Sequence, residues 1–464
     1  MLATLLSLIF AWLILSLGFA ATVPLIVWAV LIAVVWRPLA GLCLAFGLVS
    51  LFEIGGVDPL MEPGIYIHYG LQHTLGLSGV IISPLEMLLL LSLLVWLVQG
   101  ITGSGLDFRG GQVGRLVLLF GLALVAGMVR GRISGGDMYI GFWEFRPLLY
   151  ILVCYVLATN LVRTRLHVSL LTASGFIGMS LFAVEGAYRR LVLINTDIIT
   201  APMEVWYGHD TVVFIASLVV LVIAQQIFGA PAWQRTIGLL IVPVAIFTML
   251  ATERRAGQVS LIMAVLSIFF VLLFIRRKAF FLIAMPVLIA GAVYLPLFWN
   301  ASGILAQPAR AIRSISDPDP RDAASNLSRE LEKVNIRATI RAFPILGVGF
   351  GQPFLQVVQI PDISFFPFWN FEPHHNLYWI WLKTGLPGYL VFWMLIGMTL
   401  VRAAHLTKTL RTRDLQVFAL LALTGIVSTL TFCYVDLGLT MGRITVYLGI
   451  LFGVVAILDQ IPAE

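Results

Sequence analysis

Residues 237–275 read IGLLIVPVAIFTMLATERRAGQVSLIMAVLSIFFVLLFI, two apolar runs separated by one short charged stretch. Each run approaches the length of about 20 residues with which a helix crosses the apolar core of a bilayer. A helix satisfies its own backbone hydrogen bonds in lipid, where no water is available to do so. The stretch therefore predicts a helical hairpin in a membrane, with Glu253, Arg254 and Arg255 at its tip.

The remainder of the chain repeats this pattern. Its 464 residues are 60% hydrophobic and only 11% charged, and a mean hydropathy of +1.00 lies outside the range of soluble globular proteins. We predict an all-α polytopic membrane protein with about 12–14 transmembrane helices, in which residues 1–464 form a single integral membrane domain. The candidate spans are 3–20, 22–36, 38–52, 81–99, 115–129, 147–162, 168–184, 211–228, 237–252, 256–275, 279–297, 377–402, 415–434 and 441–459.

The distribution of Lys and Arg indicates which side of the membrane the termini face. Short cytoplasmic connections tend to carry an excess of both, whereas long translocated loops are exempt from the rule. With cytoplasmic termini, thirteen basic residues fall on the cytoplasmic side and fourteen on the opposite side, but seven of the fourteen lie in residues 298–376. We therefore expect cytoplasmic termini and a long periplasmic loop at 298–376.

This loop is the one sizeable stretch that is predicted to leave the membrane, which makes it the expected place for binding or catalysis. Within it, residues 326–343, NLSRELEKVNIRATIRAF, have the spacing of an amphipathic helix. One side of that helix is expected to be apolar and another to be basic. The apolar side would hold Leu327, Leu331, Val334 and Ala338, and the basic side Arg329, Lys333, Arg337 and Arg341.

The basic side has two interpretations, a face on solvent or lipid headgroups, or a site for an anionic partner. Arg329 falls in the first turn of the predicted helix, where a cation opposes the helix dipole, and this favours an anionic partner. At the hairpin tip, Arg254 and Arg255 either extend towards the interface, or Arg255 points into a cavity at the membrane boundary. A guanidinium binds phosphate oxygens bidentately, so Arg255 suits a pyrophosphate carried on a lipid.

Two other features have structural interpretations. PILGVGFG (344–351) contains three alternating glycines but no surrounding βαβ unit, so it predicts a tight turn that brings backbone close to another element rather than a nucleotide site. Asp436 and Arg443 lie on opposite sides of a short turn and are expected to neutralise one another. The sequence predicts no cofactor, no metal site and no nucleic-acid-binding module.

The stretch FEPHHN (371–376) places His374 and His375 at the head of the next span. Histidine titrates near neutrality and is therefore a natural base for removing a proton from a sugar hydroxyl. A lone histidine in this position would more often be structural. Both histidines are candidates for the general base.

Taken together, these motifs resemble the O-antigen ligase and polymerase superfamily. The resemblance is carried by residues 250–400, with TERRAG, an arginine ahead of PILGVGFG, and HHN followed by KTGLPG. Members are membrane glycosyltransferases of the C-type architecture that act on undecaprenyl-diphosphate-linked glycans. Where the family has Ser-Arg after a span, this chain has Arg254 and Arg255. Arg329 matches the arginine ahead of the glycine turn, while Lys333 replaces an aromatic residue.

The family's His-Asn, His-Ser or His-Gln pair precedes a Gly-x-x-Gly at a fixed spacing, and here that glycine pair is Gly385 and Gly388. His375 followed by Asn376 keeps the composition of the pair but leaves the spacer one residue short. His374 followed by His375 restores the spacing but places histidine in the second position. Both alignments stay open, with His374 slightly favoured by geometry.

The resemblance implies a metal-independent, inverting transfer of a glycan from undecaprenyl diphosphate to a glycolipid or glycan acceptor, at the outer face of the bacterial inner membrane. His374 or His375 would be the base, and Arg255 and Arg329 would hold the diphosphate. Arg254, Arg337 and Arg341 would extend the basic surface. Membrane lipids would surround the protein.

Three alternatives remain. One is polymerisation of repeat units of O-antigen, capsule or exopolysaccharide, and another is transfer onto a protein hydroxyl. The third is a transporter or flippase of lipid-linked sugars, in which the same cations would bind the headgroup without chemistry.

Overall fold

The computed structural model describes residues 22–53, 67–68, 70, 81–103, 107–194, 208–361 and 366–462. In these residues every regular element is a helix. Ten helices are long and apolar enough to cross a membrane, and three shorter apolar helices accompany them. The predicted all-α polytopic membrane fold is thus confirmed, and the predicted span 3–20 lies outside the described residues.

The long helices are α6 (Pro84–Thr102), α7 (Gly114–Ile133), α8 (Met138–Leu161), α9 (Arg165–Tyr188) continued by η2 (Arg189–Leu193), α10 (Thr211–Phe228), α11 (Ala232–Ala251), α12 (Arg255–Ile275), α13 (Arg277–Phe298), α16 (Asn376–Thr409) and α17 (Arg413–Val435). The shorter apolar helices are α2 (Thr22–Trp36), α3 (Pro38–Leu51) and α18 (Gly442–Val455). Between α13 and α16 lie η3 (Ile304–Ala306), α14 (Gln307–Arg313) and α15 (Pro320–Ala342), and η4 (Leu458–Gln460) follows α18.

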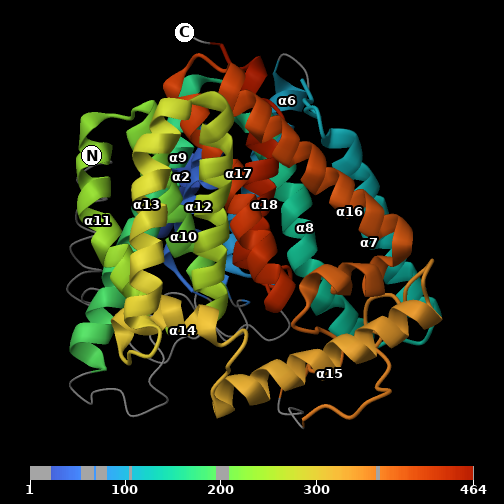
Figure 1. Cartoon of the computed structure of the whole chain (residues 1–464). Coiled ribbons are helices and arrows are strands. Elements are labelled where there is room, and N and C mark those ends of the chain that lie inside the picture. The colour runs from blue at the N-terminus through green and yellow to red at the C-terminus, as the bar shows by residue number, and fades with distance from the viewer. Residues whose placement is uncertain are drawn as a thin grey trace.

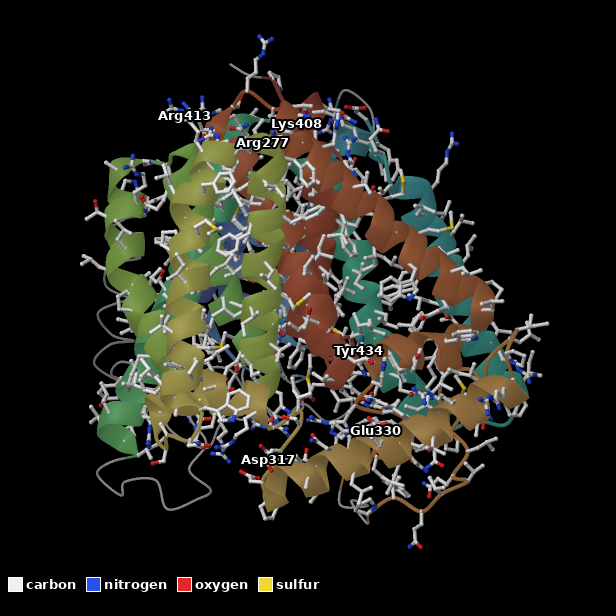
Figure 2. All side chains as sticks on the ribbon, viewed as in Figure 1. Arg277, Asp317, Glu330, Lys408, Arg413 and Tyr434 are labelled. Carbon is white, nitrogen blue, oxygen red and sulfur yellow. The ribbon has the colours of Figure 1, made fainter. Side chains whose placement is uncertain are left out.

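The helices form one bundle whose centre is occupied by α10 and α17. Helix α17 packs against α10, α12 and α16, α8 packs against α18, and α3 against α9. Helices α14 and α15 lie across one end of the bundle, and the C-terminus lies at the opposite end (Figure 1). Figure 2 shows Arg277, Lys408 and Arg413 at that opposite end. The segment predicted to leave the membrane therefore forms a layer on one end of the bundle.

Helices α8 and α18 approach closely because α18 presents two glycines to its partner. A Cβ at Gly449 would lie 2.7 Å from the carbonyl oxygen of Ile151, and one at Gly453 would lie 2.9 Å from that of Tyr155. Small residues at a helix interface in a membrane allow the two backbones to meet and maximise their van der Waals contact.

Helix α15 begins six residues before the predicted start at 326. The Asp319 side chain caps it by accepting a hydrogen bond from the backbone N–H of Asp322 (2.8 Å), and Pro320 occupies the first turn. Arg329 consequently lies in the third turn rather than the first. The predicted conflict between Arg329 and the helix dipole was therefore wrong, because the dipole acts mainly within the first turn.

The predicted apolar side of α15 was wrong for two of its four residues, whereas Leu331 packs against an apolar cluster. Leu327 is 60% exposed and Val334 is 43% exposed. The buried face carries both apolar and polar side chains. Ile336 packs with Phe354, Ile360 and Leu382. The polar side chains bind the backbone of residues 355–358: Asn335 accepts from the amides of that segment at 2.9 Å and donates to one of its carbonyls at 2.8 Å, and Thr339 accepts from another amide at 2.9 Å. The buried side of α15 therefore also satisfies the hydrogen bonds of the segment that it covers.

The glycine-rich segment after α15 is a tight turn, as predicted. Gly347, Gly349 and Gly351 have φ values of 64°, 89° and 74°, in a region that side chains with a Cβ rarely adopt. The turn is bonded to three helices. The Val348 amide donates to Leu382 (2.7 Å), the Phe350 amide to Gly127 (3.2 Å) and the Gly351 amide to the Glu144 carboxylate (2.6 Å).

We expect Gly349→Ala to lower the free energy of unfolding by about 1–3 kcal/mol, because it forces a strained φ. The added Cβ would also lie 2.8 Å from the Gly127 carbonyl oxygen. Gly291→Ala is the matched control, since Gly291 is helical with nothing within 4 Å of its Cβ position. That change should leave stability equal or slightly higher. Thermal unfolding of both variants in detergent tests this, and equal melting temperatures would contradict it.

Helix α16 contains a break that the predicted span 377–402 did not include. Gly385 has φ 69° and ψ −176°, so the helix stops and restarts there. The Leu386 amide donates to the carbonyls of Pro344 (3.2 Å) and Ile345 (3.1 Å) in place of a helical partner. The first part of α16 is thereby fixed to the glycine turn, and its N-terminal end lies beside α15.

Candidate active site

A cavity of about 510 Å³ lies at the end of the bundle that α14 and α15 cover. It is enclosed by the turn between α11 and α12, by α14, by the N-terminal half of α15 and by the end of α17. Five arginines line it, namely Arg190, Arg254, Arg255, Arg310 and Arg329. The carboxylates in its lining are those of Glu253, Asp322 and Asp436. The cavity is therefore strongly basic and suits an anionic ligand.

The turn between α11 and α12 directs its two arginines to different parts of the cavity. Glu253 has a positive φ of 53°, an uncommon conformation for a residue other than glycine. Arg255 contacts Asp322 (3.3 Å), and its guanidinium also donates to the side chains of Ser314 (3.2 Å) and Asn326 (3.3 Å). Arg255 is thus held by α14 and α15.

Arg254 points towards a second group of residues around Asp436, which follows α17. Its guanidinium donates to Nε2 of His209 (2.6 Å), and Nδ1 of His209 lies 2.9 Å from the Asp436 carboxylate. Arg329 approaches the same carboxylate at 3.8 Å. Burial raises the pKa of Asp436, but the hydrogen bond from His209 and the nearby positive charges, that of Arg329 among them, outweigh it and hold the pKa well below its usual range.

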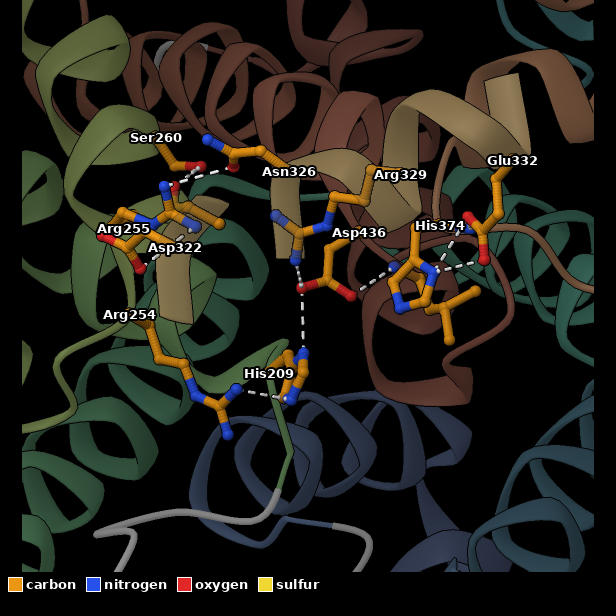
Figure 3. Close-up of polar contacts among 12 residues, drawn as sticks. His209, Arg254, Arg255, Ser260, Asp322, Asn326, Arg329, Glu332, His374 and Asp436 are labelled. Atoms are coloured by element: carbon orange, nitrogen blue, oxygen red, sulfur yellow. Dashed lines mark hydrogen bonds and ion pairs between the residues drawn. The ribbon is translucent and has the colours of Figure 1, made fainter. Parts of the chain in front are cut away.

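His374 lies between Glu332 and Asp436 (Figure 3). Its Nδ1 is 3.0 Å from both Glu332 oxygens, and its backbone N–H donates to the same carboxylate (3.2 Å). Burial lowers the pKa of His374, but the hydrogen bond and charge of Glu332, with the charge of Asp436, raise it above its ordinary value. Because Nδ1 is bound to Glu332, Nε2 is the nitrogen available for other chemistry.

His375 is in a different environment from its neighbour. It is the N-cap of α16, where Nδ1 accepts from the Tyr378 amide (3.4 Å), and its ring stacks on the Tyr378 ring with centroids 4.1 Å apart. Burial, followed by the charges of Lys333 and Arg337, lowers the pKa of His375 to about 4. A neutral, capped and stacked imidazole has the features of a structural residue.

The structure brings together some of the predicted site residues and separates others. Arg254, Arg255 and Arg329 line the cavity, and His374 lies next to Asp436 at its side. Arg337 and Arg341 are exposed on α15 and do not line the cavity. Of the predicted residues, the geometry therefore favours three arginines and His374.

The sequence interpretation missed His209, Glu332, Arg310 and a site role for Asp436. No spacing links these positions, since they come from four separate segments. The predicted pairing of Asp436 with Arg443 was wrong: the Arg443 guanidinium lies 3.5 Å from Asp210 and donates to the Val49 carbonyl (2.8 Å). Arg443 belongs to α18 and is fully buried there, so the packing of α18 directs it away from Asp436.

The described residues contain no group of three or more His, Cys, Asp and Glu side chains arranged to hold a metal ion. The guanidinium groups that line the cavity are the groups suited to an anion.

Comparison with known proteins shows which family the middle of the chain resembles. A search of the curated proteins found no match. A family model described as O-antigen ligase matches residues 237–393, which include Arg254, Arg255, Arg329 and His374. Residues 237–393 of this multi-pass membrane protein therefore carry an O-antigen ligase domain, which confirms the resemblance to the O-antigen ligase and polymerase superfamily.

Proposed function

We propose that this protein is an inverting, metal-independent glycosyltransferase that moves a glycan from undecaprenyl diphosphate to an acceptor hydroxyl. The observation that carries the proposal is the arginine-lined cavity beside a histidine that is held by a carboxylate. The O-antigen ligase domain supports a membrane glycosyltransferase role in polysaccharide assembly. The donor and the acceptor are those that the family resemblance implies, and the roles of the residues are inferred from the chemistry of the site.

In the proposed reaction, Nε2 of His374 removes the proton from the acceptor hydroxyl. Glu332 orients the ring and stabilises the imidazolium that forms, because it accepts the hydrogen bond from Nδ1. The acceptor oxygen bonds to the anomeric carbon of the donor sugar as the bond from that carbon to the phosphate oxygen breaks. Attack from the face opposite the leaving group inverts the anomeric configuration.

The leaving group of this reaction is the lipid diphosphate. Negative charge develops on its bridging oxygen as the glycosidic bond breaks, and fixed cations around that oxygen lower the barrier. Arg255 and Arg329 are placed to bind the two phosphates, with Arg254 and Arg310 beside them. Arg255 contacts Asp322 and Arg310 contacts Asp319, so a bound diphosphate would take the place of two carboxylates.

We place the protein in the bacterial inner membrane with this site on the periplasmic side. The support is the charge distribution: the basic residues expected to face the cytoplasm include Arg277, Lys408 and Arg413, which lie at the end of the bundle opposite to α15. Labelling of single cysteines at position 278 and at position 317 with a membrane-impermeant maleimide tests this. Cysteine at 317 should react in intact spheroplasts, and cysteine at 278 only after lysis.

The assay for the proposal is glycan transfer by purified protein in detergent, with a lipid-diphosphate-linked glycan as donor and EDTA present. Transfer under these conditions would support a metal-independent transferase. Parallel reactions with a glycolipid acceptor and with a second lipid-linked repeat unit distinguish ligation from polymerisation. Donor binding without transfer to any acceptor would contradict the proposal and favour a carrier of lipid-linked sugars.

Transfer is expected to decline as the pH falls through the pKa of His374, because a protonated imidazole cannot accept the hydroxyl proton. Glu332 raises this pKa above its ordinary value of 6.5, so the midpoint of the profile should lie above 6.5. Glu332→Gln removes the negative charge that raises the pKa of His374, while burial still lowers that pKa. The midpoint of the profile should therefore move to lower pH. The measurement is the pH dependence of kcat/KM for both proteins.

Asp317→Asn is the control for the pH profile. Asp317 is an exposed carboxylate ahead of α15 (Figure 2), and its loss should leave the midpoint in place. An unchanged midpoint in Glu332→Gln would show that another group controls the reaction.

A further inference from the structure

Tyr434 lies on a different side of α17 from the cavity. Phe432 lines the cavity. Tyr434 is two residues further along the same helix and therefore projects to a different side of it. Its side chain is 51% exposed, and Figure 2 shows it above α15 near Glu330.

Aromatic neighbours hold the Tyr434 ring in place. The His375 ring contacts it edge to face, with centroids 4.5 Å apart and an interplanar angle of 67°. His375 in turn stacks on Tyr378 at 4.1 Å and caps α16. A fixed aromatic ring with an open face is the usual surface on which the apolar side of a sugar ring packs, and little side-chain entropy is lost when it does so.

The charge beside this ring is positive. The Lys333 ammonium lies 5.7 Å from the centroid of the Tyr434 ring. It also lies 2.7 Å from a carboxylate oxygen of Glu330, whose side chain is mostly exposed. Arg337 follows one turn later on α15 and is exposed. The charges of Lys333 and Arg337 both act on His375, which indicates that the two cations lie on the Tyr434 side of the site.

Helix α15 connects this surface to the cavity through His374. Arg329 contacts Asp436 at the cavity, Glu332 holds His374, and Lys333 lies over Tyr434. Three positions within five residues of one helix thus face the cavity, the histidine and the aromatic ring in turn. His374 lies between two surfaces of different chemistry.

We propose that Tyr434 and Lys333 form a binding site for a sugar ring that bears an anionic group, either a carboxylate or a phosphate. The sugar packs on the Tyr434 ring, and its anionic group contacts Lys333. Because it rests on the proposed function, the site is assigned to the acceptor: an acceptor on Tyr434 would present its hydroxyl to His374 and attack the anomeric carbon from the side opposite the diphosphate in the arginine-lined cavity, as displacement with inversion requires.

The test is binding to detergent-solubilised full-length protein, measured by saturation-transfer difference NMR titration. The probes are methyl glucoside, methyl glucuronide and methyl glucoside 6-phosphate, which differ only at C6. We expect both anions to bind about tenfold more tightly than the neutral sugar, which corresponds to one charge-assisted contact. A preference for one anion over the other identifies the acceptor's group as carboxylate or phosphate.

Two substitutions dissect the site. Tyr434→Ala should weaken all three probes by about tenfold or more, because it removes the packing surface. Lys333→Gln should abolish the preference for the anions and leave the neutral sugar unchanged. Lys333 belongs to neither apolar core cluster, and its ammonium pairs with the exposed Glu330, so this variant keeps the test decisive even if Tyr434→Ala fails to fold. Arg341→Gln, two turns further along α15, should retain the preference.

Inorganic pyrophosphate, titrated into the same samples, separates this inference from the proposed function. Arg255→Gln should weaken pyrophosphate binding and leave binding of the sugar anions intact, whereas Lys333→Gln should do the reverse. Equal affinity for the three sugars, or loss of the sugar anions in Arg255→Gln, would overturn the Tyr434 site. Absence of pyrophosphate binding by the unmodified protein would instead count against the donor cavity.

Discussion

His374→Ala is expected to reduce glycan transfer by about 10²- to 10⁴-fold, the contribution typical of a positioned general base. Of the two adjacent histidines, His374 is the one whose Nδ1 is bound by a carboxylate, so Nε2 is its nitrogen that can accept a proton. Binding of the lipid-linked donor should be unaffected, because the arginines of the cavity remain. The measurement is kcat for transfer together with the dissociation constant of the donor.

His375→Ala is the control for His374→Ala, because it removes the neighbouring histidine. It removes the cap of α16 and the stack on Tyr378, so it should lower the free energy of unfolding by about 1–2 kcal/mol. His375→Asn keeps a capping side chain and should recover part of that stability. If His375→Ala, fully folded, lost transfer while His374→Ala kept it, the assignment of the base would be reversed.

Arg255→Gln is expected to lower kcat/KM by about 10²- to 10³-fold, comparable to the loss of one donor to a developing anion. Arg255 lies at the cavity wall, where its guanidinium already contacts a carboxylate, a hydroxyl and an amide oxygen. Arg255→Lys keeps the charge but not the planar pair of donors, so its kcat/KM should fall between that of the unmodified protein and that of Arg255→Gln. Steady-state kinetics with a lipid-diphosphate donor measure these effects.

The control for Arg255 is Arg132→Gln. Arg132 is exposed in the last turn of α7, and the adjacent Ser134 carbonyl bonds to Gln352 after the glycine turn, which places it at the same end of the bundle. Arg132→Gln changes the net charge by the same amount as Arg255→Gln, but it should alter kcat/KM for transfer by less than about twofold. Similar losses in both variants would indicate a general electrostatic effect rather than a specific contact.

The sequence interpretation succeeded where the deciding property is local. The apolar runs predict the membrane helices because each run is as long as the bilayer is thick and must satisfy its backbone internally. The three alternating glycines predict a turn because few other residues adopt a positive φ. The short charged stretch between two spans predicts that Arg254 and Arg255 lie at one end of the bundle, and both line the cavity there.

The interpretation of α15 shows where local reasoning stopped. Leu327 and Val334 have the spacing of a buried apolar face, yet they are exposed, and Asn335 and Thr339 are buried. The surface against which α15 packs combines the polar backbone of residues 355–358 with the apolar side chains of Phe354, Ile360 and Leu382. A helix buries whichever side matches its partner, and its own sequence does not contain the chemistry of that partner.

By itself, the sequence determined that this protein is an all-α membrane protein with a basic, histidine-containing segment between two of its apolar runs. The tertiary structure decided which histidine is held by a carboxylate, since Glu332 is 42 residues from His374. It also decided that His209, 227 residues from Asp436, is the partner of that carboxylate. The physical reason is one of range. The length of an apolar run and the position of a glycine determine the structure of the chain near them. Charge pairs form between helix ends that are distant in sequence, and only the packing of the bundle brings those ends together.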